Sequence, residues 1–155
     1  MREEKAQNTN LKSALNGILL QQNDDILSQN LDCVTKRKPT EAELEKMHFA
    51  NKVCKHVKSN AIVVAKDGRT FGVGAGQMSR IKSVQIAIEK ANGQKGLAMA
   101  SDAFFPFADS IDFAAKNGVT AILQPGGSLK DKEVIQKADE LGVTMVFTKV
   151  RHFRH

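Results

Sequence analysis

The clearest pattern along the chain is a run of apolar residues at helical spacing that starts near residue 40. Thr40 and Glu43 form a capping box, in which each side chain can reach the other's backbone N–H, so a helix is predicted to begin there. The apolar positions that follow recur every three or four residues and predict one buried helix face. They are Leu44, Met47, Ala50, Val53, Cys54 and Val57.

Beyond this helix the pattern changes to that of strands. Residues 61–65 (AIVVA) are a β-branched run too short for a helix, and Asp67 and Gly68 after them favour a type I′ turn. Residues 61–65 and 70–73 are therefore predicted to form an antiparallel hairpin.

The second half of the chain alternates helices and strands at short spacing. The predicted elements are a helix from residue 81, a strand at 97–100, a helix at 109–116, a strand at 119–123, a helix capped by Ser128 and a strand at 143–148. Such alternation predicts right-handed crossovers and parallel pairing. Short strands are also predicted at residues 15–22 and 34–36. With the hairpin in front, the predicted fold class is α/β, a sandwich with a mixed sheet.

The chain of 155 residues has the size of one domain, with 41% hydrophobic and 26% charged residues. Residues 1–12 are polar and aperiodic, so we expect a flexible N-terminal arm followed by a domain at residues 13–155. No apolar run approaches the ~20 residues that a membrane crossing requires, and the N-terminus lacks the apolar stretch of a secretory signal. We therefore expect a cytoplasmic protein without a membrane partner.

Charge and cysteine content narrow the class of ligand. The net charge is +6, but Trp and Tyr are absent and the basic residues are not interleaved with stacking aromatics. Nucleic acid is therefore not the expected partner, which leaves a small anionic ligand or a basic, solvated surface. Cys33 and Cys54 form no CxxC pair and have no His at a zinc-like spacing, which argues against a zinc site or a disulfide.

A glycine-rich segment falls at a strand end, where α/β folds place their ligands. Residues 72–76 (GVGAG) precede Ser79 and Arg80 at the start of a predicted helix. Either the glycines only ease a turn, or the backbone approaches an anion at the helix N-terminus. Arg80 is correspondingly either a planar phosphate ligand or half of a surface ion pair.

Two other segments could carry chemistry. Residues 102–109 (DAFFPFAD) are too apolar for an exposed loop, so they either wall a flat heterocycle or complete the core. Residues 151–155 (RHFRH) are either a solvated tail or a packed terminus that brings cations to an anionic ligand. From the residues alone, the chain is an α/β domain that binds a phosphorylated, flat, polar molecule.

Six segments, in order and spacing, resemble AICAR transformylase, the folate-dependent part of the bifunctional AICAR transformylase/IMP cyclohydrolase family of purine biosynthesis. They are residues 34–40 (VTKRKPT), 57–63 (VKSNAIV), 74–80 (GAGQMSR), 100–107 (ASDAFFPF), 124–128 (QPGGS) and 151–155 (RHFRH). The resemblance implies that residues 13–155 are the second of two cytidine-deaminase-like subdomains. The implied fold is a three-layer sandwich with a mixed sheet and without the deaminase zinc.

The family's reaction moves a formyl group from 10-formyltetrahydrofolate, the cosubstrate, to the amino group of AICAR. The resemblance implies that Arg80 holds the AICAR phosphate and that Asn60 bonds the carboxamide. Phe104 and Pro106 would wall the imidazole. The whole implied substrate-binding set is Asn60, Gln77, Arg80, Phe104, Pro106, Phe107, Asp109 and His155. Within this set, Asp109 would lie toward the folate and His155 would close the pocket.

The resemblance also implies a monovalent cation, potassium, near Ser59 and Asp102. Val57 and Ala61 replace hydroxyl residues of some relatives, which weakens that expectation. Ala108 stands where the family usually has an Arg, so one cation near the ligand is lost.

No catalytic residue is assigned. The family's Lys-His pair lies in the upstream subdomain, and Lys55-His56 shares its letters in a different context, so we treat that likeness as coincidence. Two functions stay open: a formyltransferase half-site, completed by another chain or by a missing upstream subdomain, and a catalytically incomplete AICAR-binding or assembly module. A homo-oligomer is expected, with the aromatic loop at residues 104–107 in or beside the contact.

Overall fold

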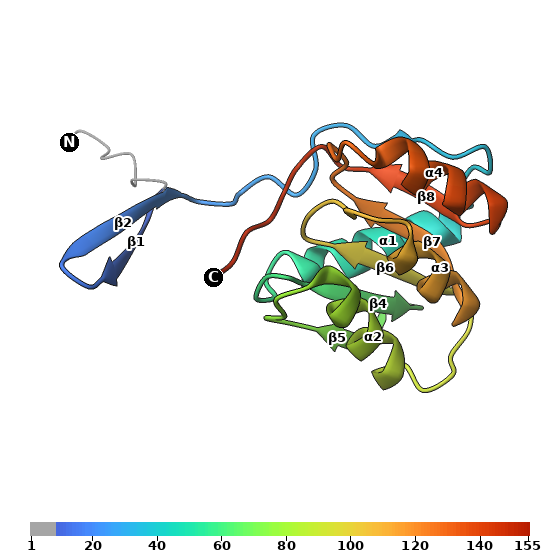
Figure 1. Cartoon of the computed structure of the whole chain (residues 1–155), viewed down its shortest axis with the longest axis horizontal. Coiled ribbons are helices and arrows are strands. Elements are labelled where there is room, and N and C mark those ends of the chain that lie inside the picture. Colours follow the sequence, from blue (N-terminus) through green and yellow to red (C-terminus); the bar gives the residue numbers. More distant parts are fainter. Residues whose placement is uncertain (1–8) are drawn as a thin grey trace, which may run out of the picture.

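The computed structural model describes residues 9–155 and shows an α/β body with a small hairpin standing away from it (Figure 1). The strands are β1 Thr9–Ala14, β2 Gly17–Gln22, β3 Asp32–Cys33, β4 Ile62–Lys66, β5 Arg69–Gly74, β6 Leu97–Ser101, β7 Val119–Gln124 and β8 Thr144–Phe147. The helices are α1 Glu41–Cys54, α2 Arg80–Lys90, α3 Asp109–Lys116 and α4 Asp131–Glu140.

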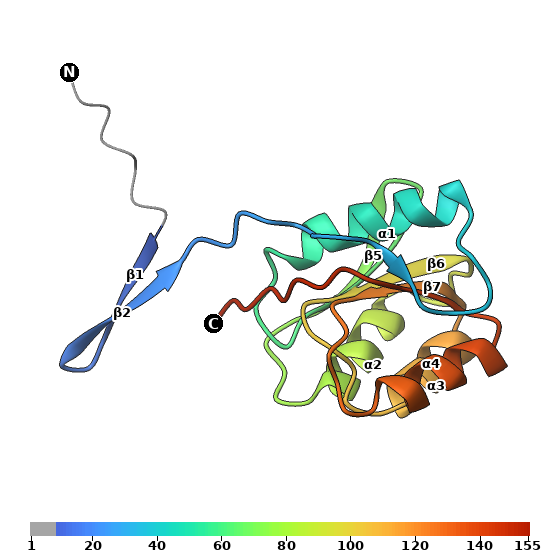
Figure 2. The same ribbon diagram turned by 90° about the horizontal axis from the view of Figure 1, so that it is seen from above.

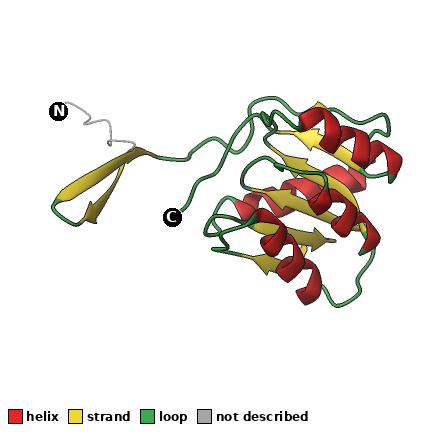
Figure 3. Cartoon of the chain, in the orientation of Figure 1, coloured by secondary structure: helices red, strands yellow, loops and turns green. Residues whose placement is uncertain are grey.

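The body is built around a mixed sheet of six strands in the order β3-β8-β7-β6-β4-β5. Strands β6, β7 and β8 are parallel, whereas β4 is antiparallel to β5 and β6, and β3 to β8. Helix α1 covers one face and α2, α3 and α4 cover the other (Figures 2 and 3). The predicted α/β sandwich with a mixed sheet is confirmed. Within the described residues, no helix is long and apolar enough to span a membrane.

Side chains of the central strands alternate between the two layers of the core. Ile62 and Val64 of β4 pack with α2, α3 and α4, whereas Val63 and Ala65 pack with α1. The predicted stripe of the first helix is core, with Met47, Ala50 and Cys54 fully buried. Burial raises the pKa of the Cys54 thiol well above its usual range, which keeps it an unreactive core residue.

The two strongest local signals in the sequence are confirmed. The Thr40 hydroxyl accepts a hydrogen bond from the backbone N–H of Glu43 at 3.2 Å, and the Glu43 carboxylate accepts one from the backbone N–H of Thr40 at 3.0 Å. Asp67 and Gly68 have φ of 49° and 69°, as the I′ turn requires of both central residues.

Element boundaries differ from prediction at several places. Of the expected flexible arm, residues 1–8 lie outside the described residues, and residues 9–12 belong to strand β1. The strand predicted at 15–22 begins at Gly17, and the one at 34–36 is instead Asp32–Cys33. Helix α4 begins at Asp131 rather than after Ser128, because Leu129 and Lys130 form a turn in which the Ser128 hydroxyl accepts from the N–H of Lys130.

The β1–β2 hairpin has one apolar face. Its register pairs Leu11 with Leu20 and Ser13 with Ile18, and paired residues share a face. Leu11, Ile18 and Leu20 are 66%, 71% and 67% exposed. The opposite face carries Lys12, which hydrogen-bonds the carbonyl oxygen of His155.

A partly buried ion pair ties the start of α1 to the sheet. The Arg37 guanidinium donates two hydrogen bonds of 2.9 Å to the Glu43 carboxylate, which also accepts from the Thr120 hydroxyl at 3.0 Å. Burial alone would raise the pKa of Glu43, but the hydrogen bonds from Arg37, Thr40 and Thr120 outweigh it and lower the pKa to about 2.

This pair predicts an acid-sensitive contribution to stability. Because the folded pKa of Glu43 lies below its ordinary value of 4.5, the contribution is complete above that value and is lost as pH falls toward 2. Glu43→Gln should lower the free energy of unfolding by about 1.5–3 kcal/mol at pH 7, and by less at pH 3. Urea unfolding at both pH values measures this. The exposed Glu45→Gln is the control, and an equal loss at both pH values would contradict the account.

Candidate functional site

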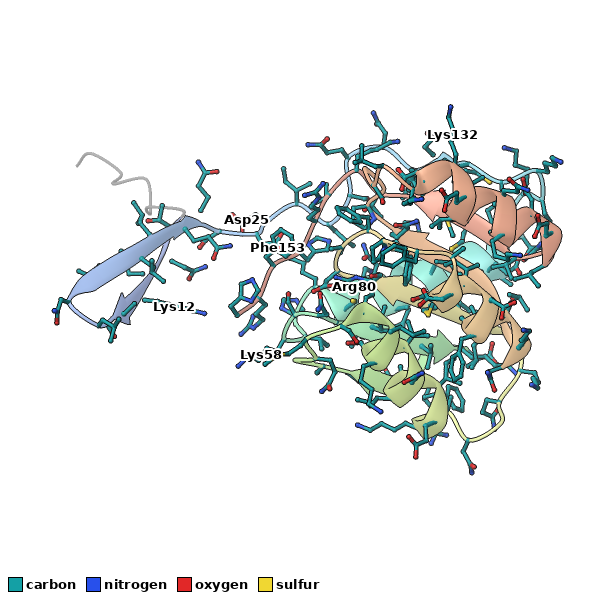
Figure 4. The ribbon with its side chains drawn as sticks, viewed as in Figure 1. Lys12, Asp25, Lys58, Arg80, Lys132 and Phe153 are labelled. Carbon is teal, nitrogen blue, oxygen red and sulfur yellow. The ribbon has the colours of Figure 1, made fainter. Side chains whose placement is uncertain are left out.

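A pocket of about 570 Å³ lies where the start of α2, the loop after β6 and the C-terminal segment meet. Its size is within the usual range for small-molecule sites. It is lined by Asn60, Met78, Ser79, Arg80, Ile81, Ala103, Phe104, Pro106, Phe107, Asp109, Ser110, Arg151 and Phe153. Figure 4 labels Arg80 in the body and Phe153 on the C-terminal segment.

Arg80 is buried at the base of the pocket, and its guanidinium already donates three hydrogen bonds to protein groups. Its Nη1 donates to Asp102 Oδ1 at 2.5 Å and to the Ser101 hydroxyl at 2.8 Å, and its Nη2 donates to Asn60 Oδ1 at 2.7 Å. Asp102 is fully buried, so the pair is an internal ion pair and not a surface one. The carboxylate therefore compensates most of the charge that Arg80 would offer to an anion.

Asp102 keeps one oxygen without a hydrogen-bond partner among residues 9–155, and that oxygen, Oδ2, is buried. A buried carboxylate oxygen of this kind suits a hard cation. The hydroxyl of Ser59, the other expected cation ligand, accepts a hydrogen bond from the N–H of Arg154 at 3.1 Å. Across residues 9–155, no group of three or more His, Cys, Asp or Glu side chains is placed to hold a metal ion.

The aromatic loop after β6 serves both the core and the pocket. Phe105 is fully buried, and its N–H donates to the buried Gln124 side chain at 3.1 Å. Phe104 and Pro106 line the pocket, and Phe107 is 59% exposed at its edge. Phe105 therefore adds nothing to an exposed surface at this loop, because the loop turns its side chain inward.

The C-terminal segment is packed against the body, as one of the two interpretations of residues 151–155 required. Arg151 and Phe153 line the pocket. The Arg151 guanidinium lies 5.0 Å over the ring of Phe104, a cation–π distance. It makes no hydrogen bond or ion pair within residues 9–155, which leaves all its N–H donors available to a ligand.

Two residues of the implied set lie elsewhere. His155 does not close the pocket but lines a neighbouring hollow between the C-terminal segment and the hairpin, where its ring stacks near Phe153. Gln77 does not line the pocket, because its side chain donates to the Ala75 carbonyl at 2.9 Å. Its own carbonyl accepts from the side chain of Asn60 at 2.8 Å, so Gln77 acts by orienting Asn60.

The glycine-rich segment has a packing role that neither interpretation anticipated. A Cβ at Gly72 or at Gly74 would lie 1.9 Å from a backbone oxygen of α2, at Ala87 and Ser83 respectively. Both glycines lie inside β5 and allow the strand to contact the helix backbone. They thereby set the position of α2 and of Arg80 at its start.

Lys55 and His56 lie away from the pocket and line the hollow beside the hairpin. The ammonium of Lys55 is 3.8 Å from Asp24 Oδ1. This position gives the pair no contact with a ligand in the pocket.

Comparison with known proteins identifies the family. The family model described as the AICARFT/IMPCHase bienzyme matches residues 1–90, more than half of the chain. This chain belongs to that family. Proteins named bifunctional purine biosynthesis protein PurH from Aquifex aeolicus, Rhodospirillum rubrum and Bacillus cytotoxicus are 52%, 55% and 56% identical over 94%, 94% and 92% of the chain. The chain spans only 29% to 30% of the length of these relatives.

One solved structure is similar at a much lower level. A dCMP deaminase from the cyanophage S-TIM5 shares 16% identity, with a TM-score of 0.44 over 70% of this chain and 98% of that protein. A similarity of this size carries no argument about fold or function.

Six residues that the sequence resemblance implies line this pocket, but Arg151, whose guanidinium makes no hydrogen bond within the described chain, is not among the implied residues. The sequence signal that could have indicated Arg151 is its spacing of two residues from Phe153, which places both side chains on one side of an extended segment. The partners of Arg80 could not be read from local pattern, because Asp102 and Asn60 are each about twenty residues from it.

The Arg80–Asp102 pair predicts a stability effect separate from any ligand. Arg80→Ala should lower the free energy of unfolding by about 3–5 kcal/mol, because it leaves the Asp102 carboxylate buried and unpaired. Arg151→Ala, at an exposed position without hydrogen bonds in the described chain, should change it by less than about 0.5 kcal/mol. Denaturant unfolding of the two variants measures the contrast, and a fully stable Arg80→Ala would show that the pair does not hold the site together.

Proposed function

We propose that this chain forms the AICAR-binding part of a formyltransferase site of purine biosynthesis, at which 10-formyltetrahydrofolate donates a formyl group to the amino group of AICAR. The observation that supports this most is the convergence of the implied residues on one pocket. Six of the eight line it, namely Asn60, Arg80, Phe104, Pro106, Phe107 and Asp109. They come from loops that are distant in sequence, and the chain belongs to the AICARFT/IMPCHase family.

The contacts within the pocket suggest how AICAR would lie. Phe104 and Pro106 supply apolar walls for the flat imidazole ring. Arg151 supplies the charge for the phosphate, because the charge of Arg80 is compensated by Asp102. We therefore assign the phosphate to Arg151 in place of Arg80, and leave Arg80 to orient Asn60 beside the carboxamide.

The side chains that line the pocket are suited to binding a ligand, but within residues 9–155 the pocket lacks an evident general base. No Lys or His is among the side chains of the described chain that line the pocket, and the carboxylate that lines it, that of Asp109, already accepts from the N–H and the hydroxyl of Ser110 at 2.6 and 3.3 Å. A positioned general base typically contributes ~10²–10⁴-fold to such a reaction. We propose that this group comes from a second chain or from a further part of the protein, so that the pocket is one half of a shared site. The alternative is an AICAR-binding or assembly module without turnover.

A monovalent cation fits the same proposal. Asp102 would offer its unpartnered Oδ2, which lies next to the Arg80 pair and below the loop that carries Phe104. Potassium at this point would satisfy the buried oxygen and stiffen the loop without taking part in group transfer.

The function is tested by AICAR binding to matched variants. Arg151→Ala should weaken the affinity by about 10- to 150-fold, the equivalent of losing a charge-assisted contact of about 1.5–3 kcal/mol. Arg154→Ala removes the same charge from a side chain that faces the other hollow, and should leave the affinity nearly unchanged. Calorimetric titration of both variants and of the wild type decides the matter. Equal affinities for wild type and Arg151→Ala would remove this residue from the site.

A further inference from the structure

The C-terminal segment runs as an extended chain between two hollows. The N–H of His152 donates to the Asp102 carbonyl at 2.9 Å, and the N–H of Ser59 donates to the Arg154 carbonyl at 2.8 Å. Side chains of an extended chain alternate in direction. Arg151 and Phe153 accordingly face the pocket, whereas the side chain of His152 points the opposite way.

His152 is fully buried although it lies three residues from the end of the chain. Its Nδ1 is 2.7 Å from Asp24 Oδ2 and its Nε2 is 3.2 Å from the Leu27 carbonyl oxygen. Both partners belong to the segment between the hairpin and β3. Each ring nitrogen is therefore within hydrogen-bond distance of an oxygen from a part of the chain that does not touch the pocket.

That segment is itself fixed to the body. The side-chain amide of the buried Asn51 in α1 donates to the Leu27 carbonyl at 3.2 Å, and the N–H of Gln29 donates to the Thr148 carbonyl at 3.1 Å. Lys55 lies 3.8 Å from the second oxygen of Asp24. Figure 4 shows the neighbouring Asp25 beside the C-terminal segment at Phe153.

We propose that Asp24, acting through His152, is a positioning residue for the pocket. It clamps the C-terminal segment from behind, so that Arg151 faces the phosphate of the ligand. The proposal rests on the proposed function only where a ligand is named; the clamp itself is a property of the chain.

The physical reason lies in the freedom of Arg151. Its side chain makes no hydrogen bond within the described residues, so its place is set by the backbone beneath it and by the ring of Phe104. Fixing a long side chain on binding costs entropy. If the backbone beneath Arg151 is already held, only the side chain has to be ordered when the phosphate binds. The clamp therefore lowers the entropic cost of binding the phosphate and of no other part of the ligand.

The test uses the full chain with Asp24→Ala, which is partly exposed and leaves the buried imidazole in place. Asp25→Ala is the matched control, since it removes the same charge one residue further on, and Asp25 hydrogen-bonds no residue among 9–155. Two ligands are titrated calorimetrically, AICAR and its nucleoside without phosphate. Native-state hydrogen exchange follows the backbone amides of His152 and Arg154.

For Asp24→Ala we expect roughly three- to tenfold weaker binding of AICAR, unchanged binding of the nucleoside, and no further loss in an Arg151→Ala background. The amides of His152 and Arg154 should exchange at least about tenfold faster than in the wild type and in Asp25→Ala. Unchanged exchange at these amides would overturn the clamp. Equal loss of affinity for both ligands would overturn its action through Arg151.

A wild type that binds neither ligand would refute the proposed function instead. The exchange rates of Asp24→Ala and Asp25→Ala would still decide whether Asp24 holds the segment.

Discussion

The buried ion pair between Arg80 and Asp102 is the contact on which the pocket depends. Arg80 is the first residue of α2, Asp102 follows β6, and Asn60, which also bonds the guanidinium, precedes β4. The carbonyl of Asp102 then receives the N–H of His152 from the C-terminal segment. Four separate parts of the chain thus meet at one buried pair of opposite charges at the base of the pocket.

This constraint determines which charges remain available to a ligand. A buried guanidinium with three hydrogen bonds to protein groups has little capacity left for a phosphate, and moving it would leave Asp102 buried and unpaired. Arg151 is in the opposite state, exposed and over the face of an aromatic ring. In the proposed function, the structural role falls to Arg80 and the ligand-binding role to Arg151, so the base of the pocket can stay rigid while the exposed arginine binds the ligand.

The features that could be predicted from the sequence are those that depend on residues close together in the chain. The capping box of Thr40 and the I′ turn at Asp67 depend on residues within a few positions of one another, and both formed as expected. β1 was missed because residues 9–14 have no alternating pattern, and its pairing depends on β2 alone. The close contact of Gly72 and Gly74 with α2 depends on a helix that follows in sequence but packs across the strand, which no spacing rule detects.

The same difference between local patterns and contacts of distant residues applies to the site. The resemblance to the family named six of the thirteen lining residues, because they lie in segments that recur in the family at recognisable spacing. Gln77 and His155 of the implied set lie outside this pocket, because Gln77 is turned by its hydrogen bond to the Ala75 carbonyl and His155 follows the terminal segment beside the hairpin. A crystal structure of the chain with AICAR is the most direct test of the account. It should show the phosphate bonded to Arg151 with the Arg80–Asp102 pair intact; a phosphate bonded to Arg80, with that pair broken, would contradict it.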